Sequence, residues 1–272
     1  MKPAPSREKG KAIMQSYYWE TQIEYLKNTR KQFWNDDYLE FLVKQVWKID
    51  QPVNVIDFGC GFGYLGIKLM PLLAVGSTYT GIDLGGELLM NAKQLFQNAP
   101  FQTRFIKADL IDFVPAKKYD VTICQAVLRH IPQYKHVLRN MVDSTAEGGK
   151  VICIEVNRRM ENAGLYMEGV DFHIDERDAL IKEKWREEEQ NNGRDYLAGI
   201  KIPILMEELG LRDVSVRVND FVEFISRKQD IDGYHEHINA FMAEHGYEEH
   251  LKNGISVSAL NARSLLISFG TK

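Results

Sequence analysis

Short apolar runs alternate with amphipathic segments along much of the chain. The run at residues 53–58 is rich in β-branched residues, which is typical of a strand buried on both faces of a parallel sheet. By the same pattern, strands are predicted at 78–82, 102–107, 119–125 and 149–156, with helices at 36–49, 64–74, 87–98 and 133–146. Alternating strands and helices with short connections predict an α/β fold with a doubly wound sheet.

The alternation is interrupted twice before it resumes with a helix at 196–209, a strand at 212–218 and a last strand at 265–269. The interruptions, at 157–195 and 220–258, are expected to be helical insertions. The first contains a charged helix ending at Gly193, and the second a short helix around 233–244. Residues 1–35 are expected to form a tail and an aromatic helical cap, and residues 36–272 a single domain.

Composition narrows the function classes. The chain has 272 residues, of which 44% are hydrophobic and 26% charged, with a net charge of −4, as is usual for a soluble globular protein. The three cysteines lack a CxxC pair, which predicts reduced thiols in the cytoplasm. No apolar run reaches the roughly 18 residues of a membrane span, so no membrane partner is expected. Without an overall basic field, nucleic acid is a disfavoured partner.

No metal site is expected either. Four histidines occur in the last third of the chain, but they lack HExxH or a comparable ligand spacing. A solvated helix surface explains them better. These residues are His235, His237, His245 and His250.

A glycine-rich segment follows the first strand and admits two cofactors. Gly61-x-Gly63-x-x-Gly66 matches the dinucleotide fingerprint, and Asp83 lies where an acid would hold the ribose of a nicotinamide cofactor. This leaves an NAD(P)-dependent oxidoreductase as an alternative. In a wider frame, Asp57 lies just before the glycines, where a carboxylate would repel a pyrophosphate. The same carboxylate would attract the sulfonium and ammonium groups of S-adenosylmethionine.

With Asp57 included, the segment resembles motif I of the class I S-adenosylmethionine-dependent methyltransferases. Gly81-Ile82-Asp83-Leu84 is similar to the second motif of that family, whose acid binds the ribose hydroxyls, and Ala108-Asp109-Leu110 to its adenine site. Cys124-Gln125-Ala126-Val127-Leu128 stands where the family supplies backbone contacts near the sulfonium. The resemblance covers residues 50–156. It implies a Rossmann-like, seven-stranded, mostly parallel sheet with an antiparallel last strand. The cofactor-binding residues that it implies are Asp57, Gly59, Cys60, Gly61, Gly63, Asp83, Leu84, Asp109, Leu110 and Gln125.

The methyl acceptor is expected at the carboxyl ends of the strands, beside the sulfonium, with S-adenosylhomocysteine as the product. His130 is the candidate catalytic base because its ordinary pKa suits proton transfer near neutrality; alternatively, it only shapes the pocket. The other candidate acceptor-binding residues are Tyr18, Trp19, Arg129, Glu155, Asn157 and Arg158.

The segment after the fourth strand also bears on the class of acceptor. It lacks the Asn/Asp-Pro-Pro-Tyr signature of the family members that methylate amino groups of bases and of glutamine. Its His130-Ile131-Pro132 resembles the quinone and natural-product methyltransferases, which implies an oxygen, nitrogen or carbon acceptor on a small metabolite. A non-catalytic S-adenosylmethionine-binding protein is the remaining alternative.

Overall fold

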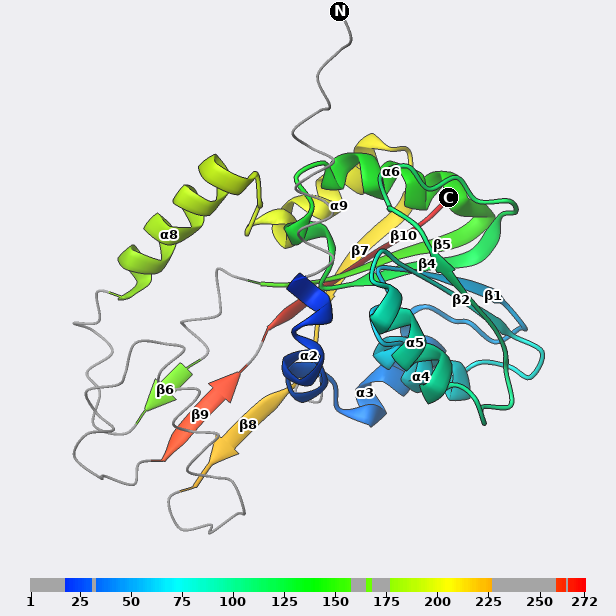
Figure 1. Cartoon of the computed structure of the whole chain (residues 1–272), viewed down its shortest axis with the longest axis horizontal. Helices are drawn as coiled ribbons and strands as arrows, with labels where there is room; N and C mark the ends of the chain where they lie inside the picture. The colour runs from blue at the N-terminus through cyan, green and yellow to red at the C-terminus, as the bar shows by residue number, and fades with distance from the viewer. Residues whose placement is uncertain (1–17, 31–32, 158–164, 168–176, 227–257, 263) are drawn as a thin grey trace, which may run out of the picture.

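A central seven-stranded sheet organises the molecule (Figure 1). The computed structural model describes residues 18–30, 33–157, 165–167, 177–226, 258–262 and 264–272. The strand order in the sheet is β3-β2-β1-β4-β5-β10-β7. The first five strands run parallel, and β10 is antiparallel to both of its neighbours. The strands are β1 (Asn54–Phe58), β2 (Thr78–Asp83), β3 (Gln102–Lys107), β4 (Tyr119–Gln125), β5 (Thr145–Val156), β7 (Arg212–Val218) and β10 (Leu265–Thr271).

This sheet confirms the predicted fold class and all seven predicted strands. Several predicted bounds were wrong: the helix expected to reach residue 98 ends at Leu95, and the one expected to reach residue 146 ends at Ser144. Thr145 has an extended conformation (φ −83°, ψ 140°) and pairs with Tyr119 of β4, so β5 begins there. The pairing with a strand that is distant along the chain overrides the local helical pattern.

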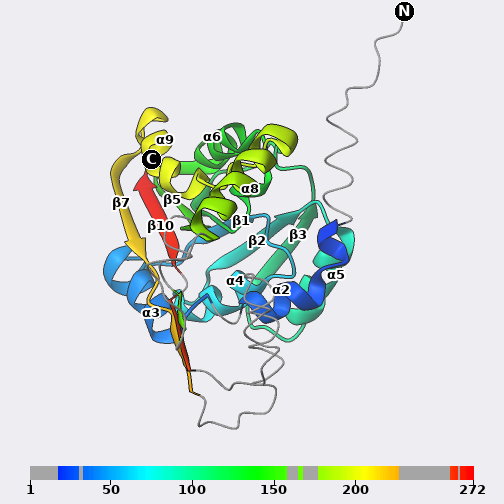
Figure 2. The ribbon, with the colours of Figure 1, turned by 90° about the vertical axis from the view of Figure 1, so that its left-hand side faces the viewer.

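Helices cover both faces of the sheet, as the two views agree (Figure 2). One face carries α3 (Asp36–Phe41) with its π-helical continuation Leu42–Val46, α4 (Tyr64–Leu69) with the 3-10 turn Met70–Leu72, and α5 (Gly86–Leu95). The other face carries α6 (Tyr134–Ser144) and α9 (Ala198–Glu208). Apolar side chains fill both interfaces, for example Val55 on the first and Ile56 on the second. Each central strand is therefore buried on both sides.

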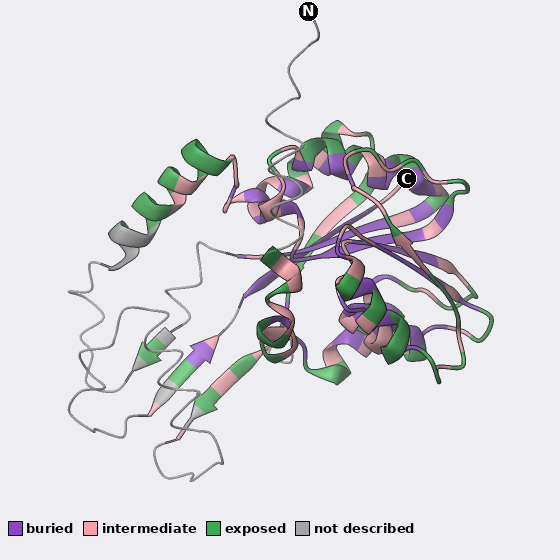
Figure 3. Cartoon of the chain, viewed as in Figure 1, coloured by how far each residue is buried: buried purple, intermediate pink, exposed green. Residues whose placement is uncertain are grey.

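Two helices lie beyond the carboxyl ends of the strands. They are α2 (Ile23–Arg30) and α8 (Arg177–Asn192). The second is the charged helix expected from the sequence, and most of its described side chains are exposed (Figure 3). Gly193 follows it with φ 66°, a left-handed conformation that suits a helix C-terminus.

A second, three-stranded antiparallel sheet was not predicted. It has the order β6-β9-β8 and contains β6 (Leu165–Met167), β8 (Val222–Ile225) and β9 (Ala259–Ala262). The insertions were expected to be helical, and the helix expected around 233–244 lies outside the described residues. Strands of three or four residues are too short to give a periodic signal. In the described part of the chain, no helix combines the length and the apolar character needed to cross a bilayer.

Candidate functional site

The glycine loop between β1 and α4 is held in a single tight conformation. Gly59, Gly61 and Gly63 have φ of 76°, 55° and 86°, which disfavours residues with a Cβ. The amides of Gly59 and Cys60 both donate to the carbonyl of Ile82 in β2, at 2.8 and 2.9 Å. A Cβ on Gly59 would lie 2.6 Å from Cγ2 of Val127. The loop is thus tied to β2 and packed against the segment that follows β4.

Asp57 is buried at the end of β1, with 1% of its surface exposed. Its Oδ2 accepts a hydrogen bond from the Tyr79 hydroxyl at 2.7 Å. Burial raises the pKa of Asp57 to about 7; the Tyr79 hydrogen bond opposes this change and the charge of Asp83 adds to it. A cation beside Asp57 would stabilise its charged form, so the residue is suited to bind an ammonium group.

Asp83 connects the glycine loop to the beginning of α5. Its Oδ2 accepts from the amide of Gly61 and its Oδ1 from the amide of Gly85, both at 2.8 Å. Burial raises the pKa of this carboxyl, and the amides of Gly85 and Gly61 act in the opposite direction. Asp109, which follows β3, makes a similar contact with the backbone. Its Oδ1 accepts a hydrogen bond from the amide of Ile111 at 2.9 Å.

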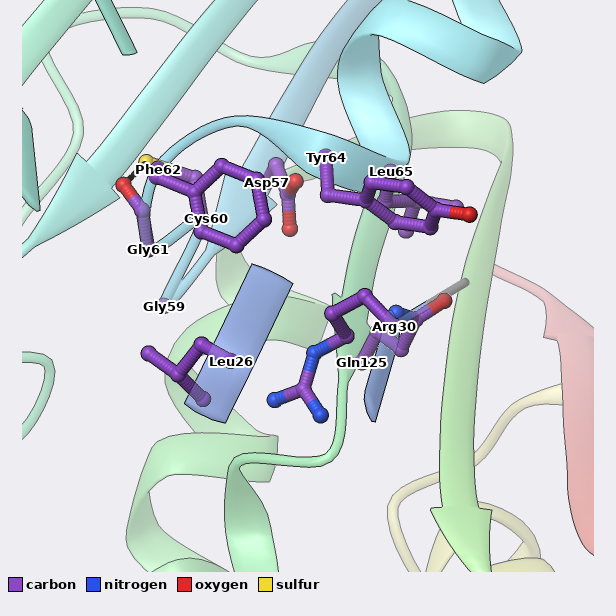
Figure 4. A pocket seen from close by; sticks show the side chains of 10 residues that line it. All are labelled: Leu26, Arg30, Asp57, Gly59, Cys60, Gly61, Phe62, Tyr64, Leu65 and Gln125. Atoms are coloured by element: carbon purple, nitrogen blue, oxygen red, sulfur yellow. Dashed lines mark hydrogen bonds between the residues drawn. The ribbon is translucent and has the colours of Figure 1, made fainter. Parts of the chain in front are cut away.

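A large cavity lies at the carboxyl ends of β1, β2 and β4, and its volume is about 940 Å³. Seven of the ten predicted cofactor-binding residues line it: Gly59, Gly61, Asp83, Leu84, Asp109, Leu110 and Gln125. Asp57 and Cys60 line a small pocket that shares Gly59, Gly61 and Gln125 with the cavity (Figure 4). The tenth, Gly63, lines neither space and lies beside Phe96.

The predicted acceptor residues divide into three groups. Tyr18, Trp19 and His130 line the large cavity, and the rings of Trp19 and His130 are in edge contact with centroids 4.8 Å apart. Arg129, Glu155 and Asn157 line neither the cavity nor the small pocket. Arg158 lies outside the described residues.

The structure adds residues that sequence reasoning missed, above all Arg30 and Leu26 of α2. Trp19, Ile23, Leu26 and Arg30 follow a helical spacing, so a search for one face of the N-terminal helix could have found them. Others come from α5, from the segment after β3 or from the segment before α6, and the rest from the end of α8 and the turn after it. They are Leu88, Ile111, Asp112, Ile131, Pro132, Gln133, Glu189, Gln190, Asn191, Asn192, Gly193 and Arg194.

Arg30 lies across the small pocket from Asp57 (Figure 4). Its guanidinium carbon is 4.7 Å from the centre of the Phe33 ring. Burial lowers the pKa of Arg30 to about 10, with Arg129 acting in the same direction. A cation therefore stands opposite a buried carboxyl, an arrangement that matches the two charges of an amino-acid group.

Comparison with known proteins gives consistent similarities. A family model described as a methyltransferase domain matches residues 49–209. The ubiquinone biosynthesis O-methyltransferase of Citrobacter koseri is 28% identical over 121 residues, which are 44% of this chain and 49% of that protein. The chain thus spans about half the length of the curated relatives that it matches.

Solved structures share the fold at low sequence identity. The phosphoethanolamine N-methyltransferase 2 of Haemonchus contortus, in complex with S-adenosylmethionine, has a TM-score of 0.54 and is 14% identical, over 87% of this chain and 52% of that one. The YcgJ protein of Bacillus subtilis has a TM-score of 0.53 and is 11% identical, over 87% and 98% of the two chains. These likenesses concern the fold alone. Because the family model covers more than half of the chain, the protein belongs to the methyltransferase domain family.

Proposed function

We propose that the protein is an S-adenosylmethionine-dependent methyltransferase that methylates a small molecule by in-line displacement. The proposal rests on the hydrogen bonds that backbone amides of the glycine loop already make within the protein. The amides of Gly59 and Cys60 bond to Ile82, that of Gly61 to Asp83 and that of Gly63 to Cys60. A pyrophosphate needs such amides as donors. The loop therefore favours a ligand without phosphate, against the nicotinamide alternative.

The charges around the loop support the same cofactor. Asp57 suits the ammonium and Arg30 the carboxylate of an amino-acid group, and they line one small pocket. Asp83, at the next strand end, has carboxylate lone pairs suited to ribose hydroxyls, and Asp109 and Leu110 lie further along for the adenine. S-adenosylmethionine supplies the electrophilic methyl group, and these residues would bind and orient its carrier.

The cavity has room for a second ligand. Its volume of about 940 Å³ is near the upper end of the range for small-molecule sites. Besides Trp19 and His130, residues 189–194 also line the cavity. We infer that the N-terminal cap and the end of α8 build the acceptor side, where they align the acceptor and exclude water. The volume of this cavity suits a small molecule, which supports a small-molecule acceptor over nucleic acid.

Buried thiols support a reducing location for this activity. Cys60, Cys124 and Cys153 are all buried and unpaired. Proteins of oxidising compartments commonly use cysteines in disulfides, whereas cytosolic proteins keep them reduced. We therefore place the proposed enzyme in the cytoplasm.

Calorimetry with three ligands tests the cofactor. We expect binding of S-adenosylmethionine and S-adenosylhomocysteine and none of NAD⁺, because the loop amides are already bonded. Binding of NAD⁺ alone would contradict the proposal. A screen of small phenols, amines and carboxylic acids for methyl transfer then tests catalysis, since a non-catalytic binding protein would bind the cofactor and methylate none of them.

A matched pair of ligands tests the placement of the amino-acid group. 5′-Methylthioadenosine lacks the amino-acid group that S-adenosylhomocysteine carries. Arg30→Met should weaken binding of S-adenosylhomocysteine by about 10- to 100-fold through loss of a charged hydrogen bond, and leave 5′-methylthioadenosine unaffected. The exposed Arg139 provides the control Arg139→Met. Equal weakening of both ligands would move Arg30 away from the amino-acid group.

A further inference from the structure

Glu155 is enclosed behind the cavity wall at the end of β5. Only 1% of its surface is exposed, and it lines neither the cavity nor the small pocket. Its Oε1 accepts hydrogen bonds from the amides of Val127 and Leu128, at 2.8 and 2.7 Å. Gly199 of α9 makes room for it, since a Cβ there would lie 3.2 Å from the Cβ of Glu155. The carboxylate therefore binds backbone amides of the segment that follows β4.

That segment has an unusual backbone at its first residue. Ala126 has φ 54°, the left-handed region that costs a non-glycine residue about 1–2 kcal/mol. The amide of Ala126 donates to the carbonyl of Ile154 in β5 at 2.8 Å. Together with the two bonds to Glu155, three consecutive amides are fixed by the end of one neighbouring strand. Hydrogen bonds to a carboxylate are strong enough to offset the strain.

The same segment carries Arg129 and His130, which are in contact. Nε of Arg129 lies 3.0 Å from Nε2 of His130. An arginine Nε–H can only donate, so Nε2 of His130 must accept and cannot carry a proton. The imidazole is then neutral, with its proton on Nδ1. The edge contact with Trp19 fixes the plane of the ring.

Glu155 also faces the charge of Arg129. Burial raises the pKa of the Glu155 carboxyl, and the largest opposing cause is Arg129, followed by the two amides and Arg30. Oε2 of Glu155 is buried and has no hydrogen-bond partner among the described residues. The carboxylate thus acts on this segment twice, through bonds to its backbone and through the field that it exerts on Arg129.

We propose that Glu155 and Arg129 are positioning residues that hold His130 as a neutral imidazole with the proton on Nδ1, facing the acceptor side of the cavity. The role of His130 in methyl transfer rests on the proposed function. Neither positioning residue lines the cavity or the small pocket. As long as Arg129 donates to Nε2, that nitrogen cannot take a proton from the acceptor, so a base role for His130 would require this hydrogen bond to break first.

Nitrogen-15 NMR of the histidine side chains tests the proposal on the full chain saturated with S-adenosylhomocysteine. His130→Gln identifies the signals of His130 among the seven histidines. We expect an unprotonated Nε2 and a protonated Nδ1 at neutral pH. Arg129→Lys keeps the charge but removes the Nε–H donor, so the proton should redistribute between the two ring nitrogens.

Glu155→Gln keeps an oxygen for the two amides and removes the charge that faces Arg129. We expect S-adenosylhomocysteine affinity to stay within about threefold of the wild-type value while the signals of His130 shift. The exposed residues Glu147 and Arg139 provide the controls Glu147→Gln and Arg139→Lys, which should leave those signals unchanged. Thermal unfolding verifies that each variant is folded. If Glu155→Gln does not fold, the Arg129→Lys variant alone tests the proposal.

Two results would overturn the inference. One is a wild-type His130 protonated on Nε2, and the other is a His130 spectrum that neither variant alters. A large loss of S-adenosylhomocysteine affinity in Glu155→Gln without a change at His130 would make Glu155 a ligand contact instead. Failure of the wild-type protein to bind S-adenosylhomocysteine would refute the proposed function, and the NMR of the ligand-free protein would still decide the state of His130.

Discussion

The cavity has two sides that are held together by different kinds of contact. After β2 and β3, each carboxylate bonds an amide two residues away, as Asp83 does with Gly85 and Asp109 with Ile111, and Asp83 also binds the neighbouring glycine loop through Gly61. After β4 and β5, the contacts join distant parts of the chain. Nε1 of Trp34 donates to Oε1 of Gln125 at 2.8 Å, Glu155 binds the segment after β4, and Trp19 packs against His130.

We call the side after β2 and β3 the preformed side, and the side after β4 and β5, whose contacts also involve α2 and the segment that follows it, the adjustable side. The turns after β2 and β3 are braced by their own carboxylates, and the glycine loop after β1 is bonded to Ile82 and Asp83 of the neighbouring strand, so these turns hold their geometry without help from α2. The β4–β5 side depends on α2 and on the segment that leads into it, so a shift of α2 changes Trp19 and Arg30 together. The proposed cofactor therefore lies mainly against the preformed side, and the proposed acceptor against the side whose lining includes α2.

The largest effect is expected where the two sides meet. Gly59→Ala would place a Cβ 2.6 Å from Cγ2 of Val127 in a left-handed conformation. We expect the free energy of unfolding in urea to fall by about 2–4 kcal/mol through strain and overpacking, with loss of S-adenosylhomocysteine binding. Gly148→Ala is the control, since Gly148 has φ 77° and nothing within 4 Å of the added Cβ. Equal losses in the two variants would mean that the two sides are not tightly packed there.

The second-largest effect is expected when a carboxylate of the preformed side is removed. Asp83→Ala deletes the acceptor for the amides of Gly61 and Gly85 and the proposed ribose contact. Binding of both S-adenosylhomocysteine and 5′-methylthioadenosine should weaken by about 1–3 kcal/mol, because both ligands contain the ribose. Calorimetry measures this, with the exposed Asp143→Ala as control. Unchanged affinity would place the ribose elsewhere.

A pH dependence should distinguish Asp57 from the other acids. Its pKa is raised from 3.8 to about 7, so below pH 7 a proton must leave before an ammonium can bind. S-adenosylhomocysteine affinity should fall by up to about tenfold per pH unit below 7, and Asp57→Asn should bind weakly without this dependence. A wild-type affinity that is constant between pH 5 and pH 8 would contradict the assignment.

The raised pKa of Asp57 makes folding stability change with pH in the opposite direction from ligand affinity. Between pH 4 and pH 7 the folded state holds a proton on Asp57 that the unfolded state has lost, so the wild-type protein loses stability as the pH rises. The asparagine has no charge to bury, and its amide oxygen can still accept from Tyr79. Urea unfolding should therefore show that Asp57→Asn gains stability over the wild type from pH 4 to pH 8.

The smallest expected effect is on the adjustable side. Trp34→Phe leaves Oε1 of the buried Gln125 without its hydrogen bond, which should cost about 1 kcal/mol of unfolding free energy. S-adenosylhomocysteine affinity should change less than in Asp83→Ala. Tyr38→Phe, which removes a more exposed bond to the carbonyl of Val218, is the control. A binding loss as large as that of Asp83→Ala would erase the contrast between the two sides.

The preformed side is the part of the site that the sequence made predictable. Asp57 and Asp83 lie at the ends of β1 and β2 and Asp109 follows β3, all strands predicted from the sequence, and the carboxyl ends of parallel strands lie at one edge of the sheet. The role of Arg30 depends on where α2 lies in space. The enclosed position of Glu155 depends on Gly199 and on the amides of Val127 and Leu128, which the intervening sequence does not indicate.

The fold, too, has one part that could be predicted from the sequence and one part that could not. The parallel strands were predictable because each is long enough to show its pattern and its helical partner follows at once. The sheet β6-β9-β8 joins residues 165–167 to residues 259–262 and 222–225, and none of these segments contains a repeat of apolar positions. Its pairing comes from the tertiary arrangement, which overrides weak local preferences.

The position of β10 has a consequence for the order of folding. β7 has no contact with β5 in the sheet, since β10 lies between them and pairs with both. Leu265 of β10 pairs with Val156, so this pairing closes a very long loop, which makes it a slow step. Until β10 pairs, β7 lacks its partner in the sheet and one edge of β5 is unpaired, so β10 both completes the sheet and covers an edge that could otherwise pair with another chain.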